Sequence, residues 1–355
     1  MRNVTNFRVN FVCLKIARGY FEMAEEKKSV AQIVIDNFLK DVDERGSMPW
    51  QRPYERYESF NYFSKKAYRG INRLILPGGE YITRNQINEY NKQHNEDFRF
   101  QKGIVWYPVI FFKRDVRAIG KDEFSNEFPD ATISDEGFYA HKGGWMYVAK
   151  DGKFAKQRNI LRYYLVAERQ HFMNSKGEYL PSRIETGEIV ITKQEPQAVF
   201  DDYVARSGIH VLDTLGTPCY IPDADIVMLN RHTAKEDAWF STAFHEFAHS
   251  TGHRTRLNRD GVTKSTGYGT EMYAKEECIA EIAASLCCAE TGISSVETSG
   301  SREYENSIAY VQHWKKLVKD WGKEFIYIVS QADKAFQLIC PDADISMQSA
   351  DQEEG

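Results

Sequence analysis

His245-Glu246-Phe247-Ala248-His249 is the stretch of sequence that decides how the C-terminal half of this chain folds. On a helix, residues four apart lie on one face, so both imidazoles can bind the same metal ion. Glu246 would then lie beside the open coordination position, where a carboxylate can act as a general base. Because five residues of this pattern also occur by chance, the neighbouring sequence must decide between a metal site and two surface histidines.

The neighbouring sequence favours an amphipathic helix. Thr233 and Glu236 have the spacing of a capping box that starts a helix, and Gly252 is a typical stop. With 3.6 residues per turn, the two histidines lie about 40° apart and outside the apolar half of the helix. That apolar half consists of Trp239, Phe240, Ala243, Phe244, Phe247 and Ala248. The helix is therefore predicted to pack on one side and to present both histidines on the other.

A hydrolytic zinc site usually has a third protein ligand. A third histidine six residues after His249 is excluded, because that position is Thr255. His253 lies one turn past His249, but Gly252 should end the helix before it, which makes His253 the weaker candidate.

A second predicted helix, residues 271–290, offers a better third ligand. Glu277 and Glu281 are four apart on it and share a face with small residues that lets another helix approach. Two carboxylates on such a face are costly to bury unless a metal or a histidine compensates them. We therefore predict Glu277 as the third ligand and Glu281 as the acceptor that fixes an imidazole tautomer. Glu276 points about 100° away from Glu277 and is expected to be solvated. The alternative for Glu277 and Glu281 is that both lie on an exposed acidic face and bind no metal.

Composition indicates an intracellular enzyme. The 355 residues can form two domains, and the six cysteines have no Cys-x-x-Cys spacing, which indicates reduced thiols. No apolar run is long enough to span a membrane, so no membrane association and a cytoplasmic location are expected. Met23 resembles a start better than Met1, residues 1–28 read as an extension, and residues 341–355 read as a polar tail.

The net charge of −5 conceals an asymmetry between the two halves. Residues 45–120 contain 14 Lys and Arg against 7 Asp and Glu, a balance of +7, so the rest of the chain carries −12. Aromatic residues are interleaved with these charges, and cations with exposed rings are what single-stranded nucleic acid requires. We predict single-stranded DNA as a partner. The alternative is that many of these rings belong to the core. The predicted DNA-binding residues are Trp50, Lys66, Tyr68, Arg69, Asn72, Arg73, Lys102 and Trp106.

The periodicity of apolar residues predicts an α+β chain of two modules, residues 29–173 and 197–340, joined by a linker at 174–196. Residues 54–76 are expected to be irregular and residues 120–144 to form a loop. The predicted helices are residues 30–39, 83–93, 200–207 and 302–321, with a last helix that runs to about 339. The predicted strands are residues 104–112, 161–167, 210–212 and 226–229.

Several motifs in order resemble the ArdC type of antirestriction protein, whose N-terminal domain also occurs in plasmid conjugation primases. In the first module these are Met48-Pro49-Trp50, Ala67-Tyr68-Arg69-Gly70-Ile71-Asn72, and Arg162-Tyr163-Tyr164-Leu165-Val166. In the second they are Thr242 to His253, Arg256-Leu257, Arg259, and Tyr273 to Glu281. The resemblance covers residues 30–339. It implies a first module that binds single-stranded DNA and a second that is a zincin-like metallopeptidase domain. Cys278, where an aliphatic residue is usual, and the long polar stretch 120–144 depart from the pattern.

These observations together predict a single-stranded-DNA-binding antirestriction protein of mobile genetic elements that hydrolyses peptide bonds near DNA. His245, His249 and Glu277 are expected to hold Zn²⁺ or another divalent ion such as Mn²⁺, with Glu246 as the general base. DNA-bound proteins are the expected substrates. A rival hypothesis is a DNA-coating protein that protects incoming single strands and whose metal site is structural or vestigial. A small-molecule hydrolase is a third and weaker alternative.

Overall fold

A computed structural model of the chain describes residues 28–51, 59–187, 189–190, 193–232, 236–264, 269–293, 303–341 and 346–347. Helices and strands alternate along these residues, and the predicted α+β class is confirmed. The predicted capping residue Thr233, and nearly all of the predicted N-terminal extension and polar tail, lie outside the described residues.

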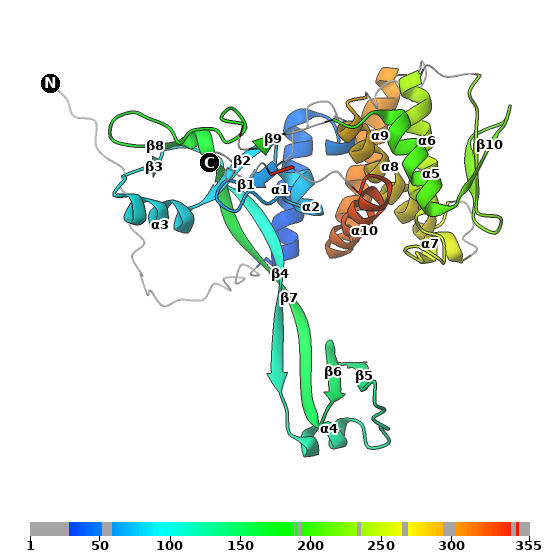
Figure 1. The fold of residues 1–355 in the computed structure, drawn as a ribbon, viewed down its shortest axis with the longest axis horizontal. Coiled ribbons are helices and arrows are strands. Elements are labelled where there is room, and N and C mark those ends of the chain that lie inside the picture. Colours follow the sequence, from blue (N-terminus) through cyan, green and yellow to red (C-terminus); the bar gives the residue numbers. More distant parts are fainter. Residues whose placement is uncertain are drawn as a thin grey trace, which may run out of the picture.

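The N-terminal half is built on a six-stranded sheet with strand order β1-β2-β7-β6-β5, in which β4 also pairs with β7 (Figure 1). Helix α1 (Val30–Arg45) begins at Ser29, whose hydroxyl accepts a hydrogen bond from the Gln32 backbone N–H over 3.1 Å. Helix α3 (Arg84–His94) begins with a complete capping box between Thr83 and Gln86. The remaining short elements of this half are η1 (Pro49–Gln51), β1 (Ser59–Asn61), α2 (Ile71–Ile75), β2 (Gly79–Thr83), β3 (Arg99–Phe100), η3 (Arg169–His171) and β8 (Phe172–Met173).

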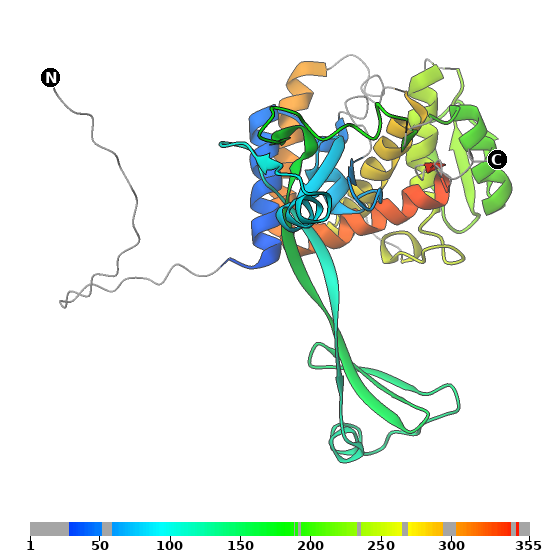
Figure 2. The same ribbon diagram turned by 60° about the vertical axis from the view of Figure 1, so that its left-hand side comes forward.

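Strands β4 (Tyr107–Ala118) and β7 (Lys153–Glu168) form a long antiparallel pair that projects from the rest of the molecule in both views (Figures 1 and 2). They pair over twelve positions, from Tyr107 opposite Val166 to Ala118 opposite Ala155. The tip carries α4 (Lys121–Glu127), β5 (Phe138–Lys142) and β6 (Trp145–Lys150). We call residues 107–168 the arm and the remainder the body.

The arm corrects two predictions from the sequence. Both predicted strands are much longer than residues 104–112 and 161–167, and residues 120–144 are not a loop but contain a helix and a strand. The added lengths of strand have charged residues on both faces, so they lack the apolar–polar alternation by which a half-buried strand is recognised.

The C-terminal half is a layer of helices beside a small sheet of strand order β10-β12-β11. Helices α6 and α8 contact each other, and α10 packs against α8 (Figure 1). Its elements are α5 (Pro196–Ser207), β10 (His210–Asp213), β11 (Cys219–Ile221), β12 (Ile226–Leu229), α6 (Glu236–Ser250), α7 (Asp260–Thr263), α8 (Glu271–Thr291), α9 (Glu303–Trp321) and α10 (Lys323–Ile339). Strand β9 (Ile189–Val190) pairs with β13 (Ser346–Met347).

One hydrophobic core joins the two halves. It contains Phe38 of α1 and Trp50 of η1 together with Phe325 and other apolar residues of α8 to α10. The rings of Phe38 and Phe325 lie 5.0 Å apart, and those of Trp50 and Trp314 lie 6.0 Å apart in an edge-to-face arrangement. Helix α1 and residue Trp50 therefore pack on the C-terminal helices, although they precede the large sheet in the sequence.

Candidate metal centre

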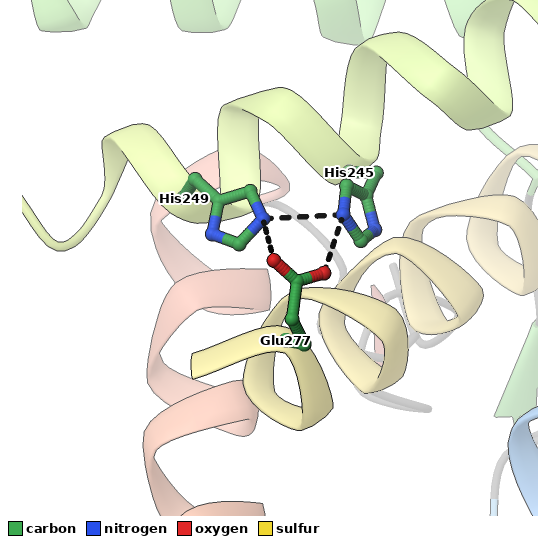
Figure 3. Close-up of side chains that lie close together, drawn as sticks. All are labelled: His245, His249 and Glu277. Carbon is green, nitrogen blue, oxygen red and sulfur yellow. Dashed lines mark hydrogen bonds and ion pairs between the residues drawn. The ribbon is translucent and has the colours of Figure 1, made fainter. Parts of the chain in front are cut away.

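Helices α6 and α8 bring three potential metal ligands together. His245 and His249 lie one turn apart on α6, and Glu277 faces them from α8 (Figure 3). The pairing of the two helices has a simple cause: α6 and α8 bury small and apolar residues against each other, including Ala248, Ala280 and Ala284. Among the residues that the structure describes, these three are the set of His, Cys, Asp or Glu side chains with the spacing of a metal site.

The geometry of the donors fits one divalent ion. The two Nε2 atoms lie 3.1 Å apart, and the Glu277 carboxylate lies 3.5 Å from His245 Nε2 and 3.6 Å from His249 Nε2. Tetrahedral ligands at about 2.1 Å from a metal are roughly 3.4 Å from one another. Two imidazole nitrogens and one carboxylate oxygen are also the donor types that zinc and similar ions prefer.

The three side chains are half-buried, with exposed fractions of 26% for His245, 15% for His249 and 27% for Glu277. Burial alone would raise the pKa of Glu277, but the hydrogen bond with His245 and the charges of both histidines outweigh burial and lower this pKa to about 2. Burial alone would lower the pKa of His245, but the hydrogen bond with Glu277 and the charges of Glu246, Glu281 and Glu277 outweigh burial and raise this pKa. The carboxylate is thus held in its ionised, metal-binding form.

Glu246 lies on the side of α6 that packs against the small sheet. Its side chain is only 8% exposed, and α6 contacts strands β11 and β12. Burial and the charge of Glu246 raise the pKa of Cys219 on β11, and that charge also raises the pKa of His245. A carboxylate in this position is near both the metal ligands and the edge strand of the sheet.

A buried ion pair between Glu276 and Arg259 lies against His249 on the side of its Nδ1, and the sequence did not predict this pair. Glu276 accepts hydrogen bonds from Arg259 Nε at 2.9 Å and Nη2 at 2.6 Å, and its Oε1 lies 3.3 Å from His249 Nδ1. The expectation that Glu276 is solvated is wrong, since the residue is 5% exposed. The error arose because the segment around α7, not visible in a helical wheel, covers this face of α8.

Glu281, predicted to fix an imidazole tautomer, forms a hydrogen bond with Tyr310 instead. Its Oε2 accepts a hydrogen bond from the Tyr310 hydroxyl over 3.0 Å, and the carboxylate that lies against His249 Nδ1 is that of Glu276. Burial raises the pKa of Glu281, while the charge of His245 and the Tyr310 hydrogen bond act against burial. Glu281 therefore lies behind His245 and connects the ligand set to α9.

His253 is not part of the ligand cluster. Its Nδ1 lies 2.8 Å from the Thr255 hydroxyl and 4.0 Å from Asp225. The turn after α6 carries it away, as the position of Gly252 indicated. An added Cβ at Gly252 would lie 2.5 Å from Val262 and 3.0 Å from Arg259, so this glycine permits the close return of the chain.

Four of the predicted DNA-binding residues have structural roles, which corrects those assignments. Trp50 is 2% exposed and lies in the core, and Tyr68 is 7% exposed beneath β2 and β4. Asn72 pairs with the backbone of Ile110 through two hydrogen bonds of 2.9 Å. Arg73 is buried, forms an ion pair with Asp333 at 3.4 Å and lies over the Phe336 ring. Their place in a basic, aromatic segment did not distinguish core from surface.

The other four predicted DNA-binding residues lie at the surface. Lys66, Arg69 and Lys102 are exposed, and Trp106 is half-buried. Arg84 lies over the rings of Phe100 and Trp106, at 4.5 and 5.5 Å from their centroids. This part of the body therefore retains cations and accessible rings.

Two further findings concern the cysteines and the helices of the described residues. Cys278, Cys287, Cys288 and Cys340 are buried free thiols, whereas Cys219 is exposed. In the described part of the chain we find no helix with the length and apolar character needed to cross a membrane.

Comparison with known proteins places the metal cluster inside a recognised domain. Residues 198–331 match the family described as zincin-like metallopeptidase. The chain is 25% identical over 331 residues to a DNA primase TraC of Escherichia coli, and 26% identical over 321 residues to another. These alignments cover 90% and 88% of the chain, which spans only 20% and 27% of the lengths of those primases. An uncharacterised protein of Sinorhizobium fredii, y4eC, is 26% identical over 293 residues and is covered to 82%.

The fold is shared with a solved antirestriction protein. The metal-free crystal structure of ArdC from the R388 plasmid superimposes with a TM-score of 0.57 at 23% identity, over 88% of this chain and 97% of that one. The Mn(II)-bound structure of the same protein gives a TM-score of 0.57 at 21% identity, over 89% and 98%.

Proposed function

Given a chain with the ArdC-type fold and a zincin-like domain at residues 198–331, we propose that it is a metal-dependent peptidase that acts at single-stranded DNA as an antirestriction protein. The observation that carries the proposal is the meeting of His245, His249 and Glu277 with Glu246 on the same helix. We place it in the cytoplasm, with residues 29–173 as the DNA-binding unit, 174–196 as the linker and 197–340 as the peptidase unit.

The three ligands would hold Zn²⁺ or Mn²⁺, and a bound ion of this kind polarises a peptide carbonyl and lowers the pKa of water. Manganese is considered because a structural relative carries Mn(II). His249 is oriented by Glu276, which Arg259 holds in turn, so the imidazole would be free to offer its Nε2 to a bound ion. Such supporting contacts typically change metal affinity by about 10- to 100-fold.

Glu246 is the proposed general base. Because it follows His245 directly and lies close to the ligands, its carboxylate can take a proton from water and return it to the departing amine. Its low exposure keeps other solvent away from the carboxylate. A purely structural ion would need no such base.

DNA binding by the first half is supported by its charge and by its relatives. Residues 45–120 carry an excess of seven positive charges, and Lys66, Arg69, Lys102 and Trp106 are accessible. The relatives include proteins named DNA primase and antirestriction protein. Basic side chains that follow phosphates concentrate the protein on DNA, where DNA-bound proteins would be its substrates.

The test compares the unaltered protein with Glu246→Gln in a protease assay on DNA-bound proteins, with and without single-stranded DNA. We expect cleavage by the unaltered protein, stimulated by the DNA, and loss of cleavage in Glu246→Gln with metal content unchanged. Equal protection of DNA in cells by both proteins would favour the rival function, in which the protein coats single strands and the metal is structural.

A further inference from the structure

The arm presents two sheet faces that differ in what covers them. On one face α4 packs through Phe124 and Phe128 onto Phe138, Tyr147 and Phe154. Nearer the root of the same face, Arg117 and Arg158 lie over the Trp145 ring at 4.8 and 4.3 Å and also pair with Asp115. The rings and charges of this covered face are thus largely occupied by one another.

The opposite face, which we call the open face, is formed by alternate residues of the same strands. Strand register places Phe112 opposite Leu161, Val116 opposite Gln157 and Tyr139 opposite Val148. Four side chains of this face are exposed, with exposed fractions of 61% for Phe112, 55% for Val116, 56% for Tyr139 and 40% for Tyr163, whereas Ile110 and Leu161 near the body pack on its core. Exposed rings in this number on one surface usually mark a binding site.

The charge of the open face is of one sign. Its strand residues include Arg114, Lys150 and Lys153 and no Asp or Glu, as the pairing register within the described arm shows. The acidic residues of the arm lie outside these strand positions: Asp115 and Glu168 are on the other face of the strands, Asp151 is in the turn between β6 and β7, and the rest are in α4 and in residues 128–137. The strand positions of the open face therefore combine cations with exposed rings and contain no carboxylates.

We propose that the open face of the arm binds single-stranded nucleic acid, with Phe112, Tyr139 and Tyr163 stacking on bases and Arg114, Lys150 and Lys153 contacting phosphates. Rings on an open sheet face can stack on unpaired bases, which a duplex does not offer. From Tyr163 to Lys153 the strand β7 runs about 33 Å at 3.3 Å per residue, a length suited to a few nucleotides. An acidic peptide would satisfy the cations but would leave the rings without planar partners.

This inference deepens the proposed function, because it rests on a nucleic-acid partner and adds a second contact surface on the arm. It also gives a role to Phe112, Val116 and Tyr139, whose exposed side chains contribute little to the cores of the described residues. The bound nucleic acid would run from the cations of the body, such as Lys102, outward along the arm.

The experiment uses the full chain and a fluorescent oligothymidylate of about 20 nucleotides, a length within reach of one or two such surfaces. We expect Phe112→Ala and Tyr163→Ala each to weaken binding by about 5- to 160-fold, the range found for loss of one stacked ring. Phe111→Ala is the matched control, because Phe111 is 42% exposed on the neighbouring position of the same strand but on the other face. Arg114→Gln and Lys113→Gln form the corresponding pair for charge.

Equal affinity of Phe112→Ala, Tyr163→Ala and the unaltered protein would overturn the proposal, even if the arm then proved to bind an acidic peptide. The metal content of the arm variants should remain unchanged. If Lys66→Gln and Lys102→Gln weaken binding while the arm variants do not, the proposed function stands and the arm proposal fails. If the unaltered protein binds no oligonucleotide, both fail together.

Discussion

The indole N–H of Trp50 donates a hydrogen bond to the Tyr310 hydroxyl over 3.0 Å, and that hydroxyl donates in turn to Glu281 over 3.0 Å. The backbone carbonyl of Trp50 accepts a further bond from the Ser285 hydroxyl at 2.6 Å. This chain of contacts links the Met48-Pro49-Trp50 motif of the first half to the helix that carries Glu277. A residue that the sequence assigned to DNA binding thus supports the metal centre.

Trp50→Ala should destabilise the whole protein. Removing a buried tryptophan typically costs about 3–5 kcal/mol of unfolding free energy, because a cavity remains. Denaturant titrations of Trp50→Ala and of the exposed control Phe112→Ala measure the difference. Retained stability together with weaker DNA binding would restore the original assignment of Trp50.

Tyr310→Phe tests the hydrogen bonds without changing the packing. Loss of the hydroxyl leaves the Trp50 N–H and the Glu281 carboxylate without this partner, at about 1–3 kcal/mol for each buried group. We expect lower stability and weaker metal affinity, measured by denaturation and by competition with a chelator. A change in stability with no change in metal affinity would limit the role of Tyr310 to folding.

His245→Ala and Glu277→Ala should each abolish metal retention after dialysis, because a three-ligand site is reduced to two. His253→Ala is the matched control on the same segment and should retain the ion, since His253 contacts Thr255 instead. Elemental analysis gives the metal content per chain. Full occupancy in Glu277→Ala would contradict the third-ligand assignment.

Gly261→Ala should disturb the support of His249. A Cβ at position 261 would lie 2.9 Å from the Cβ of Glu276 and 3.1 Å from its Oε2, so Glu276 must shift away from Arg259 and His249. We expect a loss of metal affinity within the roughly 10- to 100-fold range of supporting contacts. Gly120→Ala serves as control, because nothing lies within 4 Å of its added Cβ. Affinity equal to that of the control would show that the ion pair is dispensable.

Asp225 should make stability dependent on pH in acid. Burial acts to raise its pKa, but hydrogen bonds and charge from Arg256, with a further bond from Tyr220, lower it below 3.8 overall. A lowered folded-state pKa contributes stability above the unfolded value of about 3.9, and this contribution is lost as pH falls through the folded value. The stability difference between the unaltered protein and Asp225→Asn should therefore shrink below about pH 4. A stability difference between the two proteins that stays constant from about pH 6 to below about pH 4 would exclude the Asp225–Arg256 ion pair as the source of that difference.

How much could be read from the sequence depended on how local each interaction is. The spacing of His245 and His249 and the small residues of α8 are properties of single helices, so both helices and Glu277 were predictable. The ion pair of Glu276 with Arg259 joins residues 17 apart through a turn, and helical periodicity contains no information about it. In the sequence, the one sign that Arg259 has a role was its place among the residues that resemble ArdC-type proteins.

The basic, aromatic segment was harder to interpret because composition does not separate buried from exposed residues. Arg73 and Lys102 have the same charge, yet Arg73 lies against α10 and Lys102 faces solvent. Likewise, Phe111 and Phe112 are adjacent but lie on opposite faces of the arm, a difference that follows from strand register alone.

The contact of η1 with α9 also has a consequence for the order of synthesis. Trp50 meets Tyr310 only after 260 further residues have been added, which takes roughly 10 to 50 s at 5–20 residues per second. During this time the apolar face of α1 lacks the ring of Phe325 that will cover Phe38. A nascent chain must therefore keep this face out of contact with other chains, and exposed surface of this kind is what chaperones bind. Ribosome-bound fragments that end before α9 should consequently be much more susceptible to aggregation than the finished protein.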